Sequence, residues 1–344
     1  MSLIDKKIYI IGQGIAGSVL AFLLDRKGYT VQVIDDGHAT SSSMVAAGMW
    51  NPVSFVRMSP SWYVDKLMPL AEEVYIEMEK VLGVSFFHPM DLVKIFPDNK
   101  TANKWDEHST HPDMKDYLSA VQDESIRQQF KQSFGHGVVK HSGWLDIPAM
   151  LIALKKYFED KGMHTISSFT KEDEAGILPL EKNALVIYCT GWKNTELFAQ
   201  EVKVIPNKGE VLTIESEALQ LTRMVNFGKF LIPMGNGKFR LGSTYLRDEP
   251  NSQPTEDGKS EILSYLKNHY SKDAQVSEHV SGYRPTTIDR KPIIGLHPKN
   301  QQLGFFNGFG SKGVMLIPYF AQHFIEHLHG NQQLMKEVSV ERYF

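Results

Sequence analysis

A glycine-rich stretch near the N-terminus has the spacing of a nucleotide-binding turn. Gly12, Gly14 and Gly17 follow the apolar run Ile8–Ile11 directly, in the pattern G-x-G-x-x-G. The first glycine of such a turn permits a tight bend, the second lets the backbone approach a pyrophosphate, and the third lets the next helix pack on the strand. A purely structural turn is the alternative. The predicted dinucleotide contacts are Gly12, Gly14, Ile15, Ala16 and Gly17.

Two acidic residues end the next apolar run, where a carboxylate can reach a ribose. The strand-like run Thr30–Ile34 leads into Asp35 and Asp36, and Asp35 lies roughly 20 residues after the first glycine. A carboxylate at this position accepts hydrogen bonds from the hydroxyls of an adenosine ribose and argues against a 2′-phosphate. FAD or NAD therefore fits better than NADP.

Hydroxylated and small residues come next. The hydroxyls of Ser41–Ser43 suit phosphate or ribitol oxygens, and the small residues after them let a flat ring approach the backbone. A serine-rich loop is the alternative, which the neighbouring nucleotide turn disfavours. The segment 41–49 is therefore predicted to contact the cofactor.

Two further glycine turns follow predicted buried strands. The run 184–188 leads into Thr190-Gly191-Trp192, at the carboxyl end of a sheet, where doubly wound folds bind ligands. The run 303–306 leads into a glycine-rich turn that opens a helix running to His329, so that its N-terminus can stabilise an anion. The predicted ligand contacts are Thr190, Gly191 and Trp192 after the first strand, and Gly308 in the turn after the second.

The apolar periodicity of the whole chain predicts an α/β protein with a second, α+β domain. Helices are expected after the first turn as far as Gly28, at 62–82 and at 148–161. From 203 to 246 the period becomes that of strands, with hairpin chemistry at 235–237, and predicts an antiparallel sheet. A polar loop at 248–260 and a helix at 261–270 follow. The apolar face expected for helix 62–82 is Leu67, Leu70, Val74, Met78 and Val81.

Composition predicts an ordinary globular protein. The 344 residues are 42% hydrophobic and 22% charged, with a net charge of −3, so there is no global basic footprint for nucleic acid. The single cysteine, Cys189, excludes an internal disulfide and is expected in the core. His323, His327 and His329 are expected at the surface, without a metal. With no apolar run long enough to span a membrane and no signal peptide at Met1–Lys7, a soluble cytoplasmic protein is expected.

Taken together, these clusters resemble the glycine oxidase/D-amino-acid oxidase family of FAD-dependent oxidoreductases. The resemblance has three anchors: 12–17 with Asp35, 41–49 and 282–313. It implies a Rossmann-like FAD-binding domain in which the first anchor binds the ADP half. It implies for the second anchor that the residues along the ribityl chain and ring are Ser42, Ser43, Ala47, Gly48 and Met49. It also implies that Phe169 lies near the adenosine and that Arg284 holds a substrate carboxylate. It places at the pyrimidine end of the flavin the residues Gly310, Ser311, Lys312, Gly313, Val314 and Met315. Relatives with covalent flavin attach it to a cysteine or histidine. Here the single cysteine, Cys189, belongs to a strand, and His38 is the one histidine nearby and is not favoured for a link, so FAD is expected to be noncovalent.

The chain departs from the family at two places. Phe230 stands where glycine oxidases have a tyrosine near the substrate, so a polar contact is missing or comes from Tyr245. The turn 308–313 is also similar to that of the FAD domain of the tRNA wobble-uridine enzyme that oxidises a carboxymethylaminomethyl group. The predicted catalytic residues are Arg284, Tyr245 and Phe230.

The predicted architecture is a discontinuous FAD-binding domain, 1–55, 140–203 and 280–344, capped by a mixed or antiparallel sheet from 56–139 and 204–279. The expected reaction is oxidation of a C–N bond in an amino acid or carboxylate-bearing amine, with O2 or another electron acceptor reoxidising the flavin. An oxidase acting on tRNA and a non-catalytic flavin-binding partner are the alternatives, although nucleic acid is not the favoured partner. For Arg284, a salt bridge to Asp289 is the structural alternative.

Overall fold

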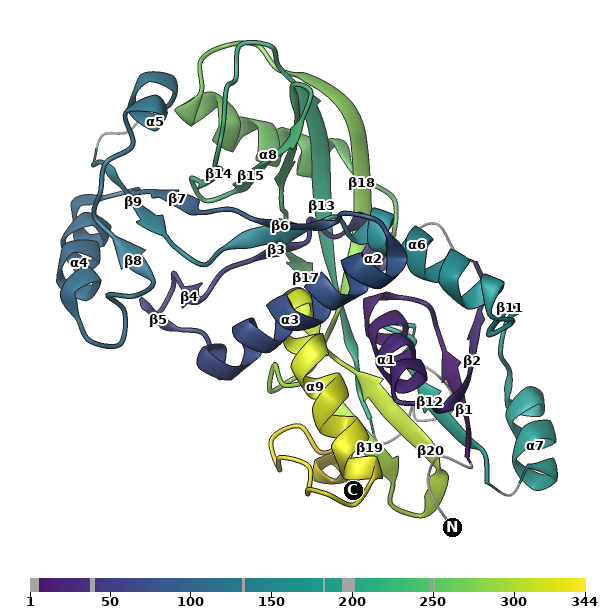
Figure 1. Cartoon of the computed structure of the whole chain (residues 1–344). Helices are drawn as coiled ribbons and strands as arrows, with labels where there is room; N and C mark the ends of the chain where they lie inside the picture. The colour runs from purple at the N-terminus through teal and green to yellow at the C-terminus, as the bar shows by residue number, and fades with distance from the viewer. Residues whose placement is uncertain are drawn as a thin grey trace.

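The computed structural model describes residues 6–37, 41–131, 134–181, 183–193, 202–247, 249 and 251–344. Within them, six strands form a sheet at the lower end of the molecule in Figure 1, in the order β11-β2-β1-β12-β20-β19. Every pairing in it is parallel except that of β19 with β20. Its strands are β1 (Lys7–Ile11), β2 (Thr30–Asp35), β11 (His164–Ile166), β12 (Leu185–Tyr188), β19 (Ile293–His297) and β20 (Asn300–Asn307).

This six-stranded sheet is covered on both faces, which explains its nearly continuous apolar strands. On β1, Ile8 and Ile10 enter the large core that includes residues of α1, α3, α6 and α9. Tyr9 and Ile11 point to the opposite face, where Ile177 and Leu178 of α7 pack. The helices of this part are α1 (Ile15–Arg26), α3 (Val64–Leu82), α6 (Ile147–Asp160), α7 (Lys171–Leu180), α9 (Gly313–Leu328) and the 3-10 segment η3 (Val340–Tyr343).

A second sheet forms the upper part of Figure 1, and nine strands of the described chain build it. Its order is β17-β13-β16-β15-β14-β7-β9-β8, with β18 also paired to β13. The sheet is mixed, because β7 and β14 are parallel while its other pairs are antiparallel. Its strands are β7 (Leu92–Ile95), β8 (Leu118–Ser119), β9 (His136–Val139), β13 (Ile205–Glu215), β14 (Met224–Asn226), β15 (Phe230–Gly235), β16 (Lys238–Gly242), β17 (Leu246–Arg247) and β18 (Gln275–Thr286).

The two faces of the second sheet pack differently. One face carries an apolar core with side chains of α5 and α8. The other packs on Trp105 of α4 and on the 47–58 segment, toward the first sheet. The remaining elements are α2 (Ser42–Val45), α4 (Asn99–Thr110), α5 (Glu124–Gln129), α8 (Glu256–His269), η2 (Gly310–Lys312), and the small sheets β3 (Met49–Trp50), β6 (Phe87–Pro89), β10 (Gly143–Leu145) and β4 (Val53–Ser54), β5 (Ser59–Pro60).

The α/β fold and the second sheet are confirmed, and three local predictions are wrong. Helix α8 begins at Glu256, inside the expected polar loop, because the Thr255 hydroxyl caps it by accepting from Gly258 N–H. Val81, expected in the apolar face of α3, is 37% exposed. His323 is buried, since the C-terminal segment covers it and Met335 N–H donates to its Nε2.

The predicted division into two domains stays a prediction. The structure adds two facts that bear on it. Helix α3, from a segment assigned to the cap, buries Leu67, Val74 and Met78 in the core of the first sheet. Strand β18 runs continuously through the predicted boundary at 280.

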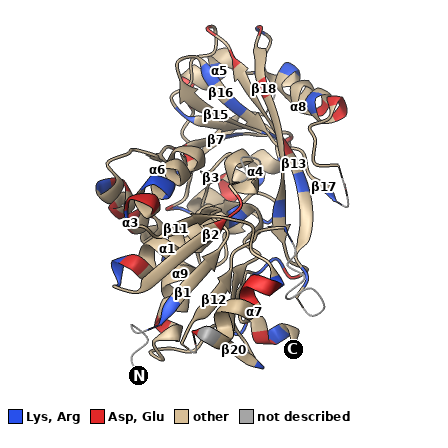
Figure 2. Cartoon of the chain, turned by 90° about the vertical axis from the view of Figure 1, so that its right-hand side faces the viewer, with Lys and Arg blue, Asp and Glu red and all other residues tan. Residues whose placement is uncertain are grey.

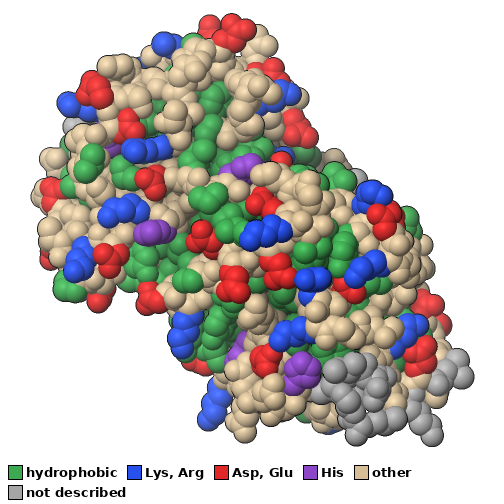
Figure 3. All heavy atoms as spheres, viewed as in Figure 1, with side chains coloured by type: hydrophobic (Ala, Val, Ile, Leu, Met, Phe, Trp, Pro, Cys, Tyr) green, Lys and Arg blue, Asp and Glu red, His purple; other side chains and the backbone are tan. Residues whose placement is uncertain are grey.

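Acidic and basic residues are interspersed over both parts of the molecule in Figure 2, and hydrophobic and charged side chains are mixed on the face shown in Figure 3. Among the described residues, none of the helices combines the length and apolar character needed to cross a membrane.

Candidate functional site

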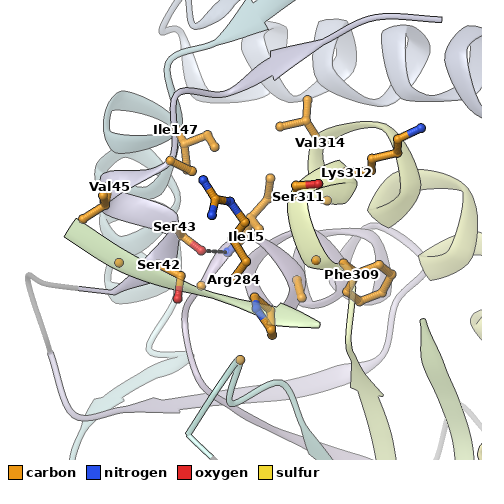
Figure 4. Close-up of a pocket in the computed structure, with 18 of the residues that line it drawn as sticks. Ile15, Ser42, Ser43, Val45, Ile147, Arg284, Phe309, Ser311, Lys312 and Val314 are labelled. Carbon is orange, nitrogen blue, oxygen red and sulfur yellow. Dashed lines mark hydrogen bonds between the residues drawn. The ribbon is translucent and has the colours of Figure 1, made fainter. Parts of the chain in front are cut away.

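A cavity of about 460 Å³ is lined by residues from both sheets. Its wall comes from the turns after β1, β12 and β20, from α2 and the residues after it, and from β13, β15 and β18. Figure 4 shows Arg284 between the serine segment and the turn at Ser311 and Lys312. The cavity brings together most of the predicted site residues: Gly12, Gly14, Ile15, Ala16, Ser42, Ser43, Ala47, Gly48, Met49, Thr190, Gly191, Trp192, Phe230, Tyr245, Arg284, Gly310, Ser311, Lys312, Gly313, Val314 and Met315.

Five predicted residues lie outside the cavity wall. A Cβ on Gly17 would lie 1.9 Å from Gly12 O, so Gly17 serves the packing of α1 on its strand. A Cβ on Gly308 would lie 2.8 Å from Thr287 Cγ2. The Phe169 ring packs 6.2 Å from that of Tyr188, and Asp36 pairs with Lys193 at 2.8 Å. Asp35 accepts hydrogen bonds from the N–H groups of Gln13 (2.9 Å) and Gly37 (2.8 Å).

The first glycine turn presents backbone to the cavity. Gly12 has φ +103°, and a Cβ there would lie 2.8 Å from Cys189 O, so only glycine fits this bend against β12. Helix α1 begins at Ile15 with no side-chain cap from Gly14. Ser43 Oγ instead accepts from Ile15 N–H (3.1 Å), the dashed contact in Figure 4. The serine segment thereby lies against the positive end of α1.

The second glycine turn opens α9 through η2. Neither helix start has a side-chain cap. Lys312 is open to the cavity, and its Nζ donates to Ser61 Oγ (3.0 Å). The dense protein around its ammonium, and then the charges of Arg57 and Lys291, lower the pKa of Lys312. This end of the cavity therefore combines a helix N-terminus with a desolvated cation.

Arg284 is held over the second sheet by neutral acceptors. Its Nη2 donates to Ser243 Oγ (2.7 Å) and Thr244 O (3.2 Å), and its Nη1 donates to Lys208 O (3.3 Å) and Asn207 Oδ1 (3.4 Å). Burial lowers the pKa of its guanidinium. Arg284 forms no ion pair with a carboxylate of the described residues. Asp289, the partner considered above, pairs with Arg342 at 3.0 Å. The alternative of a structural salt bridge to Asp289 is therefore wrong.

Tyr245 and Phe230 flank the guanidinium along the sheet. Arg284 Cζ lies 5.3 Å from the centre of the Tyr245 ring, which is 55% exposed. Phe230 lines the cavity with its ring over Gly242, where a Cβ would lie 3.0 Å from its Cζ. This part of the wall combines the apolar Phe230 ring with the guanidinium and the hydroxyls of Tyr245 and Ser243.

Sequence reasoning missed the residues that hold Arg284. A Cβ on Gly209 would lie 2.1 Å from Arg284 Nη2, so the glycine leaves room for the guanidinium to lie across β13. Asn207 stands opposite Arg284 in the pairing of β13 with β18. Ser243 comes from the end of β16. The sequence around these residues does not indicate their contact with Arg284, because that contact depends on the register of strands far apart in the chain.

The polar inventory of the cavity suits a dinucleotide cofactor. Thr190 Oγ1 lies in its wall, buried and without a hydrogen-bond partner among the described residues. The charged residues that line it are Lys193, Arg284 and Lys312, and the described part of its wall contains no Asp or Glu. A ligand with phosphates near α1 and a flat ring along the small residues 46–48 fits this set.

Comparison with known proteins gives the family. The profile of the family described as FAD dependent oxidoreductase matches residues 7–327. The chain belongs to this family. The predicted resemblance, the enzyme class and the FAD cofactor are thereby confirmed.

The relatives of this FAD-dependent oxidoreductase are distant. The bifunctional tRNA 5-methylaminomethyl-2-thiouridine biosynthesis protein MnmC of Marinobacter nauticus is 25% identical over 93% of this chain, which covers 55% of that protein. The chain thus spans about half the length of this relative. Glycine oxidase of Pseudomonas putida is 24% identical, with 96% of each chain covered. The structure of glycine oxidase from Geobacillus kaustophilus has a TM-score of 0.78 at 16% identity, covering 99% of this chain and 100% of that one, which shows a shared fold.

Proposed function

We propose that this chain oxidises the C–N bond of an amino acid, or of a secondary amine that bears a carboxylate. The observation that carries the proposal is Arg284, a half-buried guanidinium whose hydrogen-bond partners among the described residues are all neutral. An unpaired buried charge is costly unless an anion comes to it. A guanidinium fork matches a carboxylate bidentately, so a substrate carboxylate is the expected anion.

When bound, FAD would supply at N5 the acceptor for a hydride from the substrate α-carbon, and the imine product would then be hydrolysed by water. The side chains of the cavity orient the substrate and form no covalent bond with it. Arg284 holds the carboxylate, while the Phe230 ring and neighbouring apolar groups exclude water from the reacting carbon. No side chain is required as a base, because the cations of the cavity wall favour the neutral amine over the ammonium form.

A second candidate substrate is a carboxymethylaminomethyl group on a tRNA wobble uridine. It presents the same carboxylate and secondary amine. The similarity to the MnmC protein along 93% of this chain favours it. Acidic and basic residues alternate along the chain in Figure 2, and the face shown in Figure 3 offers it no broad basic surface. A non-catalytic flavin-binding partner is a third reading, which leaves Arg284 without a role.

The electron acceptor and the location belong to the same proposal. O2 or another acceptor reoxidises the flavin, and the cytoplasm is the expected compartment because of the single cysteine.

An anaerobic screen tests the proposal. Holoenzyme is mixed with amino acids, with secondary amines that bear a carboxylate and with the matching amines that lack it, and flavin bleaching is followed. Carboxylate-bearing substrates are expected to bleach the flavin, and an added arm with tRNA carrying the carboxymethylaminomethyl group separates the two candidates. Bleaching by the amines without a carboxylate, at equal rates, would exclude both.

A further inference from the structure

The short helix α2 joins the two sheets at the cavity. Ser43 Oγ accepts from Ile15 N–H in the first turn of α1 (3.1 Å), and Ser42 Oγ donates to Tyr283 O on β18. Gly282 packs directly on it, since a Cβ there would lie 3.2 Å from Val45 Cβ. One helical turn thus contacts both the nucleotide turn and the strand that carries the substrate arginine.

Arg240 fixes the other end of α2 from the second sheet. It lies on β16, and its Nη1 donates to Val45 O (3.1 Å) and Ala46 O (3.4 Å). The last carbonyl groups of a helix have no partner inside it, and a cation near them is favourable. The Arg240 side chain is only 14% exposed, so water does not readily replace these bonds.

The other contact of Arg240 is weaker. Its Nη2 lies 4.0 Å from Glu278 Oε2, and the Glu278 side chain is 53% exposed. An ion pair at that distance and exposure contributes little. The carbonyl contacts are therefore the main interaction of this guanidinium.

We propose that Arg240 is a positioning residue for the flavin-binding segment Val45–Met49. Val45 and Ala46, whose carbonyls it holds, both line the cavity together with the three residues that follow them. Without the guanidinium, these carbonyls lose their donor and the small residues along the flavin are no longer fixed. The inference rests on the FAD cofactor of the family, and not on the substrate proposed above.

The test compares four variants with the wild-type holoenzyme by the dissociation constant of FAD, measured from flavin fluorescence on dilution. Arg240→Met is expected to weaken FAD roughly 10- to 150-fold, since charge-assisted hydrogen bonds are lost. Arg240→Lys keeps a cation that reaches one carbonyl and is expected to recover part of that loss. Glu278→Gln and Lys238→Met, an exposed position on the same strand paired with Glu215, are expected to stay within about two-fold.

Melting temperatures of the variants and wild type at saturating FAD separate loss of positioning from misfolding. If only the position of the segment is lost, excess FAD restores the melting temperature of Arg240→Met to that of wild type. If Arg240→Met binds FAD with the same dissociation constant as wild type, the proposal is overturned. Equal weakening by Glu278→Gln also overturns it, because that would assign the effect to the ion pair. If Arg240→Met does not fold, the comparison of Arg240→Lys with Glu278→Gln decides on the same terms. No substrate is used, so failure here is distinct from failure of the proposed reaction.

Discussion

Arg284 is the residue whose surroundings say most about the substrate. Its four acceptors are a hydroxyl, an amide oxygen and two backbone carbonyls, and none of them neutralises its charge. These contacts fix the direction of the guanidinium without satisfying it electrostatically. A preorganised cation in a partly apolar wall loses little entropy when a carboxylate arrives.

Substitution of this arginine tests the role directly. Arg284→Met is expected to lower kcat/KM for a carboxylate-bearing substrate roughly 30- to several-thousand-fold, because removing one partner of a desolvated charge pair costs about 2–5 kcal/mol. FAD content should stay near wild type. The measurement compares an amino acid with the matching amine without the carboxylate, in both enzymes.

The control for Arg284→Met is Arg247→Met, an exposed arginine on neighbouring β17. It should keep the wild-type preference for the acid. If the Arg284 variant also prefers the acid as strongly as wild type, the arginine is structural and the amino-acid proposal loses its main support.

The flavin link is a second prediction at the scale of single residues. Cys189 is buried in the cavity wall, and burial raises the pKa of its thiol, so a reactive thiolate is disfavoured. His38, the other side chain considered for a link, lies outside the described residues. FAD is therefore expected to be noncovalent, and acid precipitation should release all the flavin into the supernatant. Yellow colour retained in the pellet would contradict this.

At the scale of elements, the arginine depends on the pairing of β13 with β18. Gly209 stands opposite Gly282, two positions from the Arg284 row, and leaves β13 flat where the guanidinium crosses it. The backbone of Gly209 is not in the left-handed region, so an alanine is strained only by this contact.

Gly209→Ala is accordingly predicted to displace the guanidinium. Overpacking of about 1–3 kcal/mol corresponds to a loss of roughly 5- to 150-fold in kcat/KM for the carboxylate-bearing substrate. The same alanine should add little in an Arg284→Met background, because the clash is gone. Gly176→Ala, in α7 with open space around its Cβ, is the control. If the losses in kcat/KM from Gly209→Ala and Arg284→Met add fully in the double variant, the effect of Gly209 does not act through Arg284.

The parts of the fold that sequence predicts are those with local signals. The nucleotide unit from Ile8 to Asp35 carries its strand, turn, helix and acid within one short stretch, and each is found as expected. The hairpin at Gly235–Gly237 is likewise local, since its turn residues have positive φ. Such features depend on neighbours in sequence and are readable from it.

The parts that it misses depend on contacts between distant segments. The expected loop 248–260 includes the first turn of α8, where Gly258 leaves room for Glu210, since a Cβ there would lie 2.2 Å from Glu210 Oε2. The Asn207 and Ser243 contacts of Arg284 follow from strand register, which local patterns do not specify. His323 was misjudged because the segment that covers it lies beyond its helix.

At the scale of the whole molecule, the second sheet buries charges on both faces. On the face of α8, Lys208 and Glu210 are fully buried and lie 3.2 Å apart. Burial alone would raise the pKa of Glu210, but hydrogen bonds from Thr255, Lys208 and His279 outweigh it and lower that pKa. This pair is compensated, so it ties β13 to α8 without leaving a free charge.

Lys94, on the opposite face, is not compensated in this way. Its Nζ donates to Asn226 Oδ1 (2.7 Å) and lies 5.3 Å from the centre of the Phe55 ring, and the described residues give it no acidic partner. Burial lowers the pKa of Lys94 from 10.5 to about 8. The unfolded chain therefore binds more protons than the folded one between about pH 8 and 10.5, so stability rises with pH across that window.

The last prediction compares wild type with Lys94→Met by urea unfolding at a fixed FAD concentration. Near pH 7 the folded protein carries a half-buried ammonium with no acidic partner among the described residues, and the apolar variant is expected to be more stable because that charge is gone. On raising the pH to 10 the wild type should gain roughly 2 kcal/mol relative to the variant, as Lys94 loses its proton more easily when folded. Lys267→Met, at an exposed position of α8, should show no such convergence. If the difference between wild type and Lys94→Met does not change with pH, the pKa of Lys94 is not lowered in the folded protein. If the difference grows as the pH rises, an anion holds that pKa above its value in the unfolded chain.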